Sequence, residues 1–211
     1  MIRQELLDEL WDFGDPAGSE RRFAGEAASQ AHTDAVRAEL VTQQARALGL
    51  QEQFGEGRAL LETLGQVDDA AVRTRIRLET GRLLNSAGNA GEAVIEFEDA
   101  AALAESGGLL FLQIDALHML AIADRPRSRD WAVKAIDRAL VAPDDRTRRW
   151  LVSLYNNLGC SWSDAGDLDR ALAAFQQAQQ WAELVGTEQQ RVWAREAVEE
   201  CAAARQARDT R

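Results

Sequence analysis

The chain has 211 residues, of which 46% are hydrophobic and 28% charged, the balance of a folded protein with a substantial core. Its formal net charge of -11 repels phosphate backbones and anionic lipid heads. Neither a nucleic acid nor a membrane is therefore an expected partner. Two unpaired cysteines, acidic residues near the amino terminus and no run of 18 apolar residues together predict a cytoplasmic location.

Good helix formers dominate the composition and β-branched residues never alternate, so an all-α fold is predicted. Periodicity and turn residues place about eleven helices, over 2–13, 17–30, 33–53, 56–65, 69–87, 90–105, 109–124, 129–141, 145–165, 168–184 and 188–207. Asp15 before Pro16 predicts an N-cap, and Thr187 with Gln190 predicts a capping box. Because no linker interrupts the pattern, a single domain over 1–211 is expected.

An internal repeat extends over most of the chain. One copy runs through Tyr155, Leu158, Gly159, Trp162, Gly166, Ala171, Phe175 and Ala178. A second copy lies 78 residues earlier, with Gly81, Gly88, Ala93 and Phe97 in the matching places. Midway between the copies stands Ala132, so three alanines follow each other at intervals of 39.

These positions resemble the signature of the tetratricopeptide repeat family, in which helix pairs carry an aromatic residue, Leu-Gly and Ala-Phe-Ala at fixed offsets. The resemblance implies a right-handed α-solenoid of antiparallel helix pairs. Residues 1–31 would form a degenerate first pair, 32–184 four repeats, and 187–208 a capping helix. Glycine inside a helix costs about 1 kcal/mol, which indicates close helix approach at Gly81 and Gly159. We expect Ala93 and Ala171 to face these glycines, with Phe97 and Phe175 one turn further on.

No catalytic site is expected in this sequence. His32 and His118 are its only histidines, and neither belongs to a group with metal-ligand spacing. There is no nucleophile elbow, phosphate loop or dinucleotide fingerprint. The sequence therefore predicts a protein that is not an enzyme and uses no metal and no cofactor.

The resemblance implies instead that the first helix of each pair lines a groove for a peptide or protein segment. Carried over by motif position, the groove residues are Gln44, Arg75, Glu79, Arg82, Asp115, His118, Ser153, Asn156 and Asn157. Asn157 matches an asparagine with which some family members bind a terminal carboxylate. The lysines of that clamp are missing here.

Several alternatives stay open at the level of sequence. The arginines at 125, 127, 129, 146, 148 and 149 form a second candidate surface for an acidic partner, although pairing with nearby aspartates is the favoured interpretation. Most tryptophans are assigned to the core, with Trp150 or Trp181 as a candidate exposed anchor. The leading function is a scaffold that binds a protein or peptide. A regulatory sensor and a self-associating structural protein are the alternatives, and the polar last helix favours a monomer over a dimer.

Overall fold

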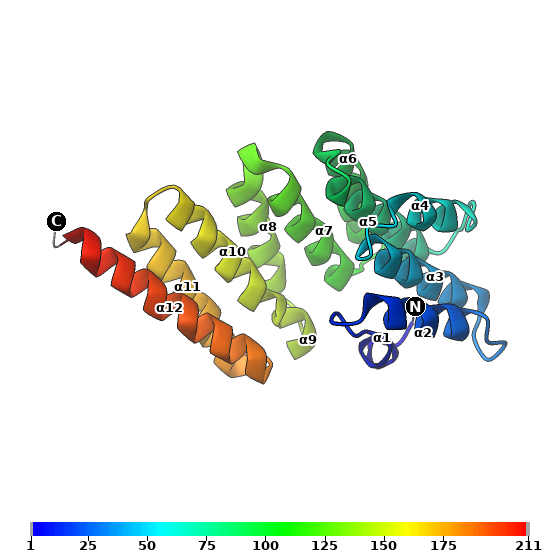
Figure 1. The fold of residues 1–211 in the computed structure, drawn as a ribbon, viewed down its shortest axis with the longest axis horizontal. Helices are drawn as coiled ribbons and strands as arrows, with labels where there is room; N and C mark the ends of the chain where they lie inside the picture. Colours follow the sequence, from blue (N-terminus) through cyan, green and yellow to red (C-terminus); the bar gives the residue numbers. More distant parts are fainter. Residues whose placement is uncertain (1, 210–211) are drawn as a thin grey trace. The chain divides into compact units, whose positions relative to one another are not determined.

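The computed structural model describes residues 2–209, so Met1, Thr210 and Arg211 of the expected 1–211 domain lie outside the described residues. Within that range every regular element is a helix and no strand occurs, which confirms the predicted all-α class (Figure 1). The right-handed solenoid stays a prediction.

The chain divides into two compact units, which we describe separately. Unit 1 covers residues 1–124 and unit 2 covers 125–211. Unit 1 contains α1 (Gln4–Leu10), α2 (Pro16–Ala27), α3 (Asp34–Gly49), α4 (Phe54–Glu62), α5 (Ala70–Ser86), α6 (Ala90–Ser106) and α7 (Leu110–Ala123). Unit 2 contains a short 3-10 helix (Arg125–Arg127), α8 (Ser128–Leu140), α9 (Asp145–Arg148), α10 (Trp150–Asp164), α11 (Leu168–Val185) and α12 (Glu188–Asp209). The expected single domain stays a prediction.

Most helices lie within a few residues of their predicted ranges, and side-chain caps mark the starts of several of them. The Asp15 side chain accepts a hydrogen bond from the Gly18 amide at the start of α2, which has Pro16 as its first residue. Thr187 and Gln190 form the reciprocal bonds of a capping box before α12. One difference is α9, a single turn ahead of α10, where one helix was expected over 145–165.

The two copies of the repeat pack in the same way in the two units. In unit 1, a Cβ atom placed on Gly81 of α5 would lie 2.5 Å from the ring of Phe97 on α6. In unit 2, a Cβ on Gly159 of α10 would lie 2.6 Å from the ring of Phe175 on α11. The aromatic rings thus cover the glycines directly, in place of the expected alanines. Ala93 and Ala171 are fully buried nearby in the same helices.

The turns inside the two repeats also correspond. Gly88 and Gly166 have φ angles of +87° and +76°, a left-handed conformation that L side chains rarely adopt. Each lets the chain reverse between two antiparallel helices, α5 and α6 in unit 1 and α10 and α11 in unit 2. Conformation and packing therefore both support the 78-residue correspondence found in the sequence.

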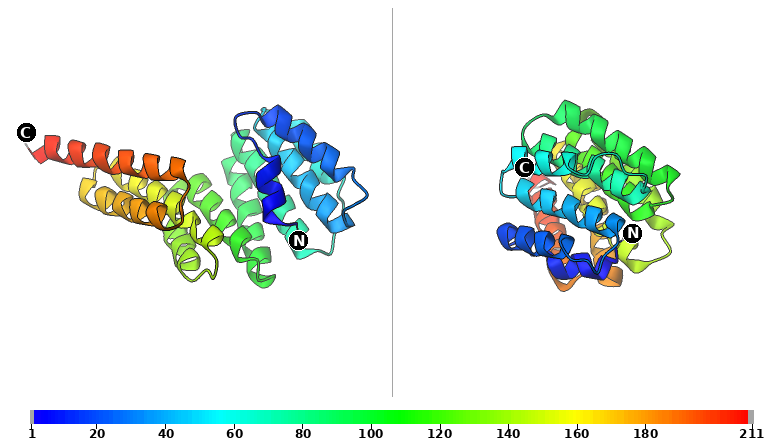
Figure 2. Two further views of the ribbon diagram at one scale, coloured as in Figure 1. Left: turned by 90° about the horizontal axis from the view of Figure 1, so that it is seen from below. Right: turned by 90° about the vertical axis from the view of Figure 1, so that its right-hand side faces the viewer.

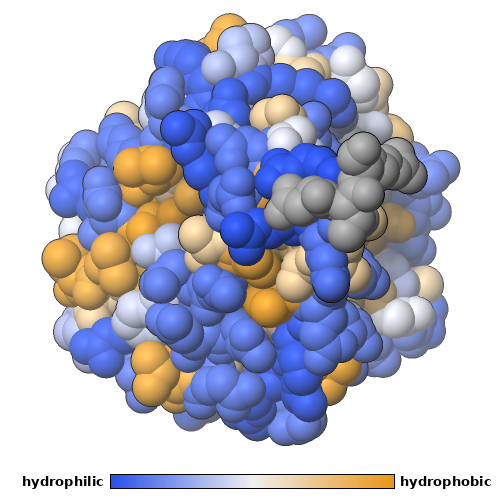
Figure 3. Space-filling view, turned by 90° about the vertical axis from the view of Figure 1, so that its left-hand side faces the viewer, coloured by the Kyte–Doolittle hydropathy of each residue, from blue (hydrophilic) through white to orange (hydrophobic). Residues whose placement is uncertain are grey.

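The last helix of unit 2, α12, packs on the preceding helix pair. α12 lies alongside α11, as the orange and red ribbons of Figure 2 show, and also contacts α10. On the face drawn in Figure 3, hydrophilic side chains predominate and hydrophobic ones form separate small patches. No helix within residues 2–209 combines the length and hydropathy that crossing a membrane requires.

Candidate functional site

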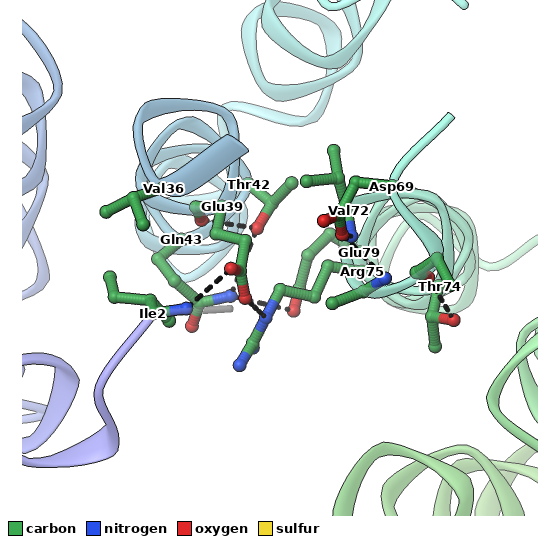
Figure 4. A network of polar contacts seen from close by, with 12 residues as sticks. Ile2, Val36, Glu39, Thr42, Gln43, Asp69, Val72, Thr74, Arg75 and Glu79 are labelled. Carbon is green, nitrogen blue, oxygen red and sulfur yellow. Dashed lines mark hydrogen bonds and ion pairs between the residues drawn. The ribbon is translucent and has the colours of Figure 1, made fainter. Parts of the chain in front are cut away.

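In unit 1, polar side chains of α3 and α5 face each other between the helices (Figure 4). Arg75 donates from Nε to the Glu39 carboxylate at 2.9 Å, and both side chains are buried. One turn further along, Gln43 donates to Glu79 at 3.4 Å. These polar side chains stand at helix positions where the apolar pattern alone would predict core residues.

Arg82 continues the network from α5 to α7. Its guanidinium donates to Glu79 of its own helix at 2.6 Å and forms an ion pair with Asp115 of α7. The Arg82 side chain is only 13% exposed and the Asp115 side chain 8%. Two carboxylates therefore share one largely buried cation.

The neighbours decide the charge state of these groups. Burial alone would lower the pKa of Arg82, but Asp115 and Glu79 outweigh it and raise that pKa. Burial would likewise raise the pKa of Asp115, and Arg82 with Arg46 holds it below its usual value. Burial lowers the pKa of His118 on α7, with Asp115 opposing and Arg82 contributing. The Arg82–Asp115 pair is therefore charged at neutral pH, and the lowered pKa of His118 keeps its imidazole neutral.

The amino-terminal segment covers one end of this network. The Ile2 amide donates to the Glu39 carboxylate at 2.6 Å, and the Trp11 indole donates to Gln43 at 3.1 Å. Trp11 stacks on Phe13 at 4.8 Å between ring centroids, and the Arg46 guanidinium lies over the Trp11 ring at 5.4 Å. Residues of unit 1 itself therefore occupy hydrogen-bonding groups of Glu39 and Gln43.

The predicted groove residues of unit 1 are thus brought together, but in a buried network. Arg75, Glu79 and Asp115 are each less than 7% exposed, where a solvated groove wall was expected. Gln44 lies elsewhere, donating to Glu20 of α2 at 2.7 Å. The physical reason is charge compensation, since each buried ion has an opposite charge on its own or a neighbouring helix. A role in partner binding stays a prediction for all five network residues, His118 included.

Sequence reasoning missed the α3 side of this network. Thirty-six residues separate Glu39 from Arg75 and Gln43 from Glu79. The same interval relates Glu79 to Asp115. The sequence analysis named Gln44, whereas the neighbouring Gln43 takes part in the network. The recurrence of polar residues every 36 positions was the signal that could have found them.

In unit 2 the corresponding helix borders an open hollow of about 330 Å³. Three predicted groove residues line it from α10, namely Ser153, Asn156 and Asn157. Gln190 and Trp193 line it from α12, and Trp193 is 60% exposed. The Asn156 side chain has no hydrogen-bond partner within residues 2–209. Sequence reasoning missed the α12 side, because it interpreted that helix as a polar cap.

The arginine groups of unit 2 engage local partners of several kinds. Arg127 lies over the Trp131 ring at 4.9 Å, and Arg129 over the Trp162 ring at 4.2 Å. Arg148 pairs with Asp145 as expected, whereas Arg149 donates to a backbone carbonyl of α11. Indole faces therefore hold two of the cations that were expected to pair with aspartates. Trp162, assigned to the core from its motif position, is only partly buried beneath these side chains.

Neither metal binding nor thiol chemistry finds support in the described part of the chain. Between residues 2 and 209 no three or more His, Cys, Asp or Glu side chains are grouped so that they could hold an ion. Partial burial and the charge of Asp164 both raise the pKa of Cys160, which disfavours its thiolate.

Comparison with known proteins identifies the fold alone. No protein-family model matches this sequence, and no curated protein matches it. Among solved structures, a similar chain is BtubC (BKLC) from P. vanneervenii, at 18% identity and a TM-score of 0.65. The match covers 95% of this chain and 92% of the other. At that identity the likeness concerns the arrangement of helices and carries no function.

Proposed function

We propose that this chain is a non-catalytic scaffold of tetratricopeptide-like helix pairs in a solenoid, which binds a peptide or protein segment. The observation that carries the proposal is the hollow between α10 and α12 of unit 2. It is open, it contains three of the groove residues expected from the sequence, and no charged side chain lines it.

The chemistry of the hollow suits an extended peptide without charged side chains. A carboxamide offers both a donor and an acceptor, which matches the alternating groups of a peptide backbone. Asn156 supplies such a group, and the Ser153 hydroxyl adds a second. Trp193 adds a large aromatic surface that is partly exposed to solvent, of the kind that anchors protein interfaces.

Selection from a peptide display library on the full chain tests this proposal. We expect the selected peptides to lose at least tenfold in affinity for Trp193→Ala and several-fold for Asn156→Ala. Leu184→Ala is the matched control for the tryptophan, because Leu184 is 71% exposed on α11 outside the hollow. Gln176→Ala on the same helix is the control for the carboxamide.

Two results would contradict the proposal. Peptides that bind the Trp193 and Asn156 variants as tightly as the native chain would show that the hollow is not the site. A library that yields no binder, together with a dimer in light scattering, would favour the self-associating alternative.

A further inference from the structure

The outer side of unit 1 has a gap where one helix is shorter than its counterpart. α4 has 9 residues and α6 has 17, although each is the second helix of its pair, α4 after α3 and α6 after α5. At the 36-residue register of this unit, residues 99–106 of α6 have no helical counterpart in α4. The shortfall of eight residues corresponds to about 12 Å, or two helical turns.

The local sequence explains why α4 ends early. After Glu62 the backbone tightens, with Thr63, Leu64 and Gly65 each donating to the carbonyl three residues before. Gly65 then adopts a φ of +58° and turns the chain away. The segment up to Asp69 crosses to α5 as a loop.

A hollow of about 810 Å³ lies at this gap. The loop after Gly65, the first two turns of α5 and the last turns of α6 form its walls. Two helical turns, taken as a cylinder about 10 Å wide, occupy on the order of 850 Å³. The space and the missing turns therefore agree in size.

The lining combines apolar side chains with two arginines, Arg73 and Arg77, and two aspartates, Asp68 and Asp99. Val67, Ile76 and Leu103 are partly exposed along the floor. Arg77 is held by Glu96 at 2.9 Å. Arg73 is exposed and forms no ion pair with any residue from 2 to 209.

The next repeat shows what covers the equivalent surface. α6 packs along α7 and reverses into it through a short turn at Gly107 and Gly108, so its last two turns lie beside the start of α7. The start of α5 lacks this cover. We propose that the hollow binds a two-turn amphipathic helix of a partner protein, with its apolar side on Ile76 and Leu103 and a carboxylate facing Arg73.

The probe for the test is a hydrocarbon-stapled peptide with the sequence of residues 99–106, which form the matching turns of α6 and carry Asp99 and Glu105. It is titrated into the ¹⁵N-labelled full chain. We expect saturable amide shifts at Val67, Ile76 and Leu103. Arg73→Glu should weaken binding at least fivefold, and Ala102→Trp should abolish it by filling the hollow.

Arg58→Glu is the control, because Arg58 is exposed on α4 and does not line the hollow. It should change the affinity less than twofold. Circular dichroism checks that Ala102→Trp folds, and Ser106→Trp replaces it if it does not.

Three outcomes would overturn the proposal. They are the absence of localised shifts at millimolar peptide, equal binding to the filled variant, and equal weakening by Arg58→Glu. If the native chain is a dimer and Ala102→Trp dissociates it, the hollow binds a second copy of this chain instead. None of these outcomes affects the site in unit 2, so the two proposals fail separately.

Discussion

Helix α5 of unit 1 and helix α10 of unit 2 carry charged and neutral residues, respectively, at corresponding positions. At the 78-residue interval, Arg75 and Glu79 of unit 1 correspond to Ser153 and Asn157 of unit 2. The charged pair joins a buried network that reaches α3 and α7, whereas the neutral residues line an open hollow. The same helix-pair framework is thus closed by ion pairs in one unit and left accessible by neutral side chains in the other.

The largest effect is expected from breaking the charge balance of unit 1. Arg82→Met leaves Glu79 and Asp115 buried without their shared cation, so we expect a loss of about 3–5 kcal/mol in the free energy of unfolding. Urea denaturation followed by circular dichroism measures it. Arg77→Met is the control, since Arg77 is 46% exposed and should cost less than about 1 kcal/mol. Equal losses in both variants would contradict a special role for the network.

A smaller loss of stability, equal in the two units, is expected at the two glycines that phenylalanine rings cover. Gly81→Ala and Gly159→Ala each push a Cβ into a phenylalanine ring, so both should destabilise the chain by about 1–3 kcal/mol. Gly25→Ala in α2 has open space around the new atom and should be neutral or slightly stabilising. A gain in the urea midpoint for either ring-covered glycine would show that the helices can separate at no cost.

Just below pH 7.5, the pH dependence of stability should come from His118 of unit 1. Burial lowers the pKa of His118, so the unfolded chain takes up a proton at higher pH than the folded one. Stability should therefore fall as the pH drops from about 7.5 through 6.5, and become level below the folded pKa. One group contributes at most about 1.4 kcal/mol per pH unit. His118→Gln should reduce the slope in urea titrations across this range, and an unchanged slope would assign it to other groups.

The smallest effect is expected at the hollow of unit 2. Asn156→Ala removes a half-buried carboxamide that bonds to no described residue, so unfolding should change by less than about 0.5 kcal/mol. The same urea measurement applies. A loss of more than 1 kcal/mol would mean that Asn156 supports the fold and would weaken its assignment to a binding surface.

Much of the fold could be predicted from local sequence signals, whereas only part of the candidate sites could. The caps at Asp15 and Thr187 and the turn at Gly166 mark helix ends through contacts a few residues apart. The polar network depends on contacts 33 to 36 residues apart, so helix periodicity could not reveal which charges meet.

The hollow of unit 2 shows a similar limit. Ser153 and Asn156, which the motif offsets named, line its α10 side, and their role in binding stays a prediction. The α12 side depends on how one helix packs beside another after a tight turn. Trp193 was counted among the core tryptophans because it lies on a predicted helix with apolar neighbours, although it is 60% exposed.

The regular spacing of the network has a consequence for how this chain tolerates changes in length. An extra residue in the loop between α4 and α5 leaves every side chain of α5 on its original face. An extra residue within α5 rotates all that follow by about 100°, which would turn Arg82 away from Asp115. Natural insertions and deletions in unit 1 should therefore gather in its connecting loops.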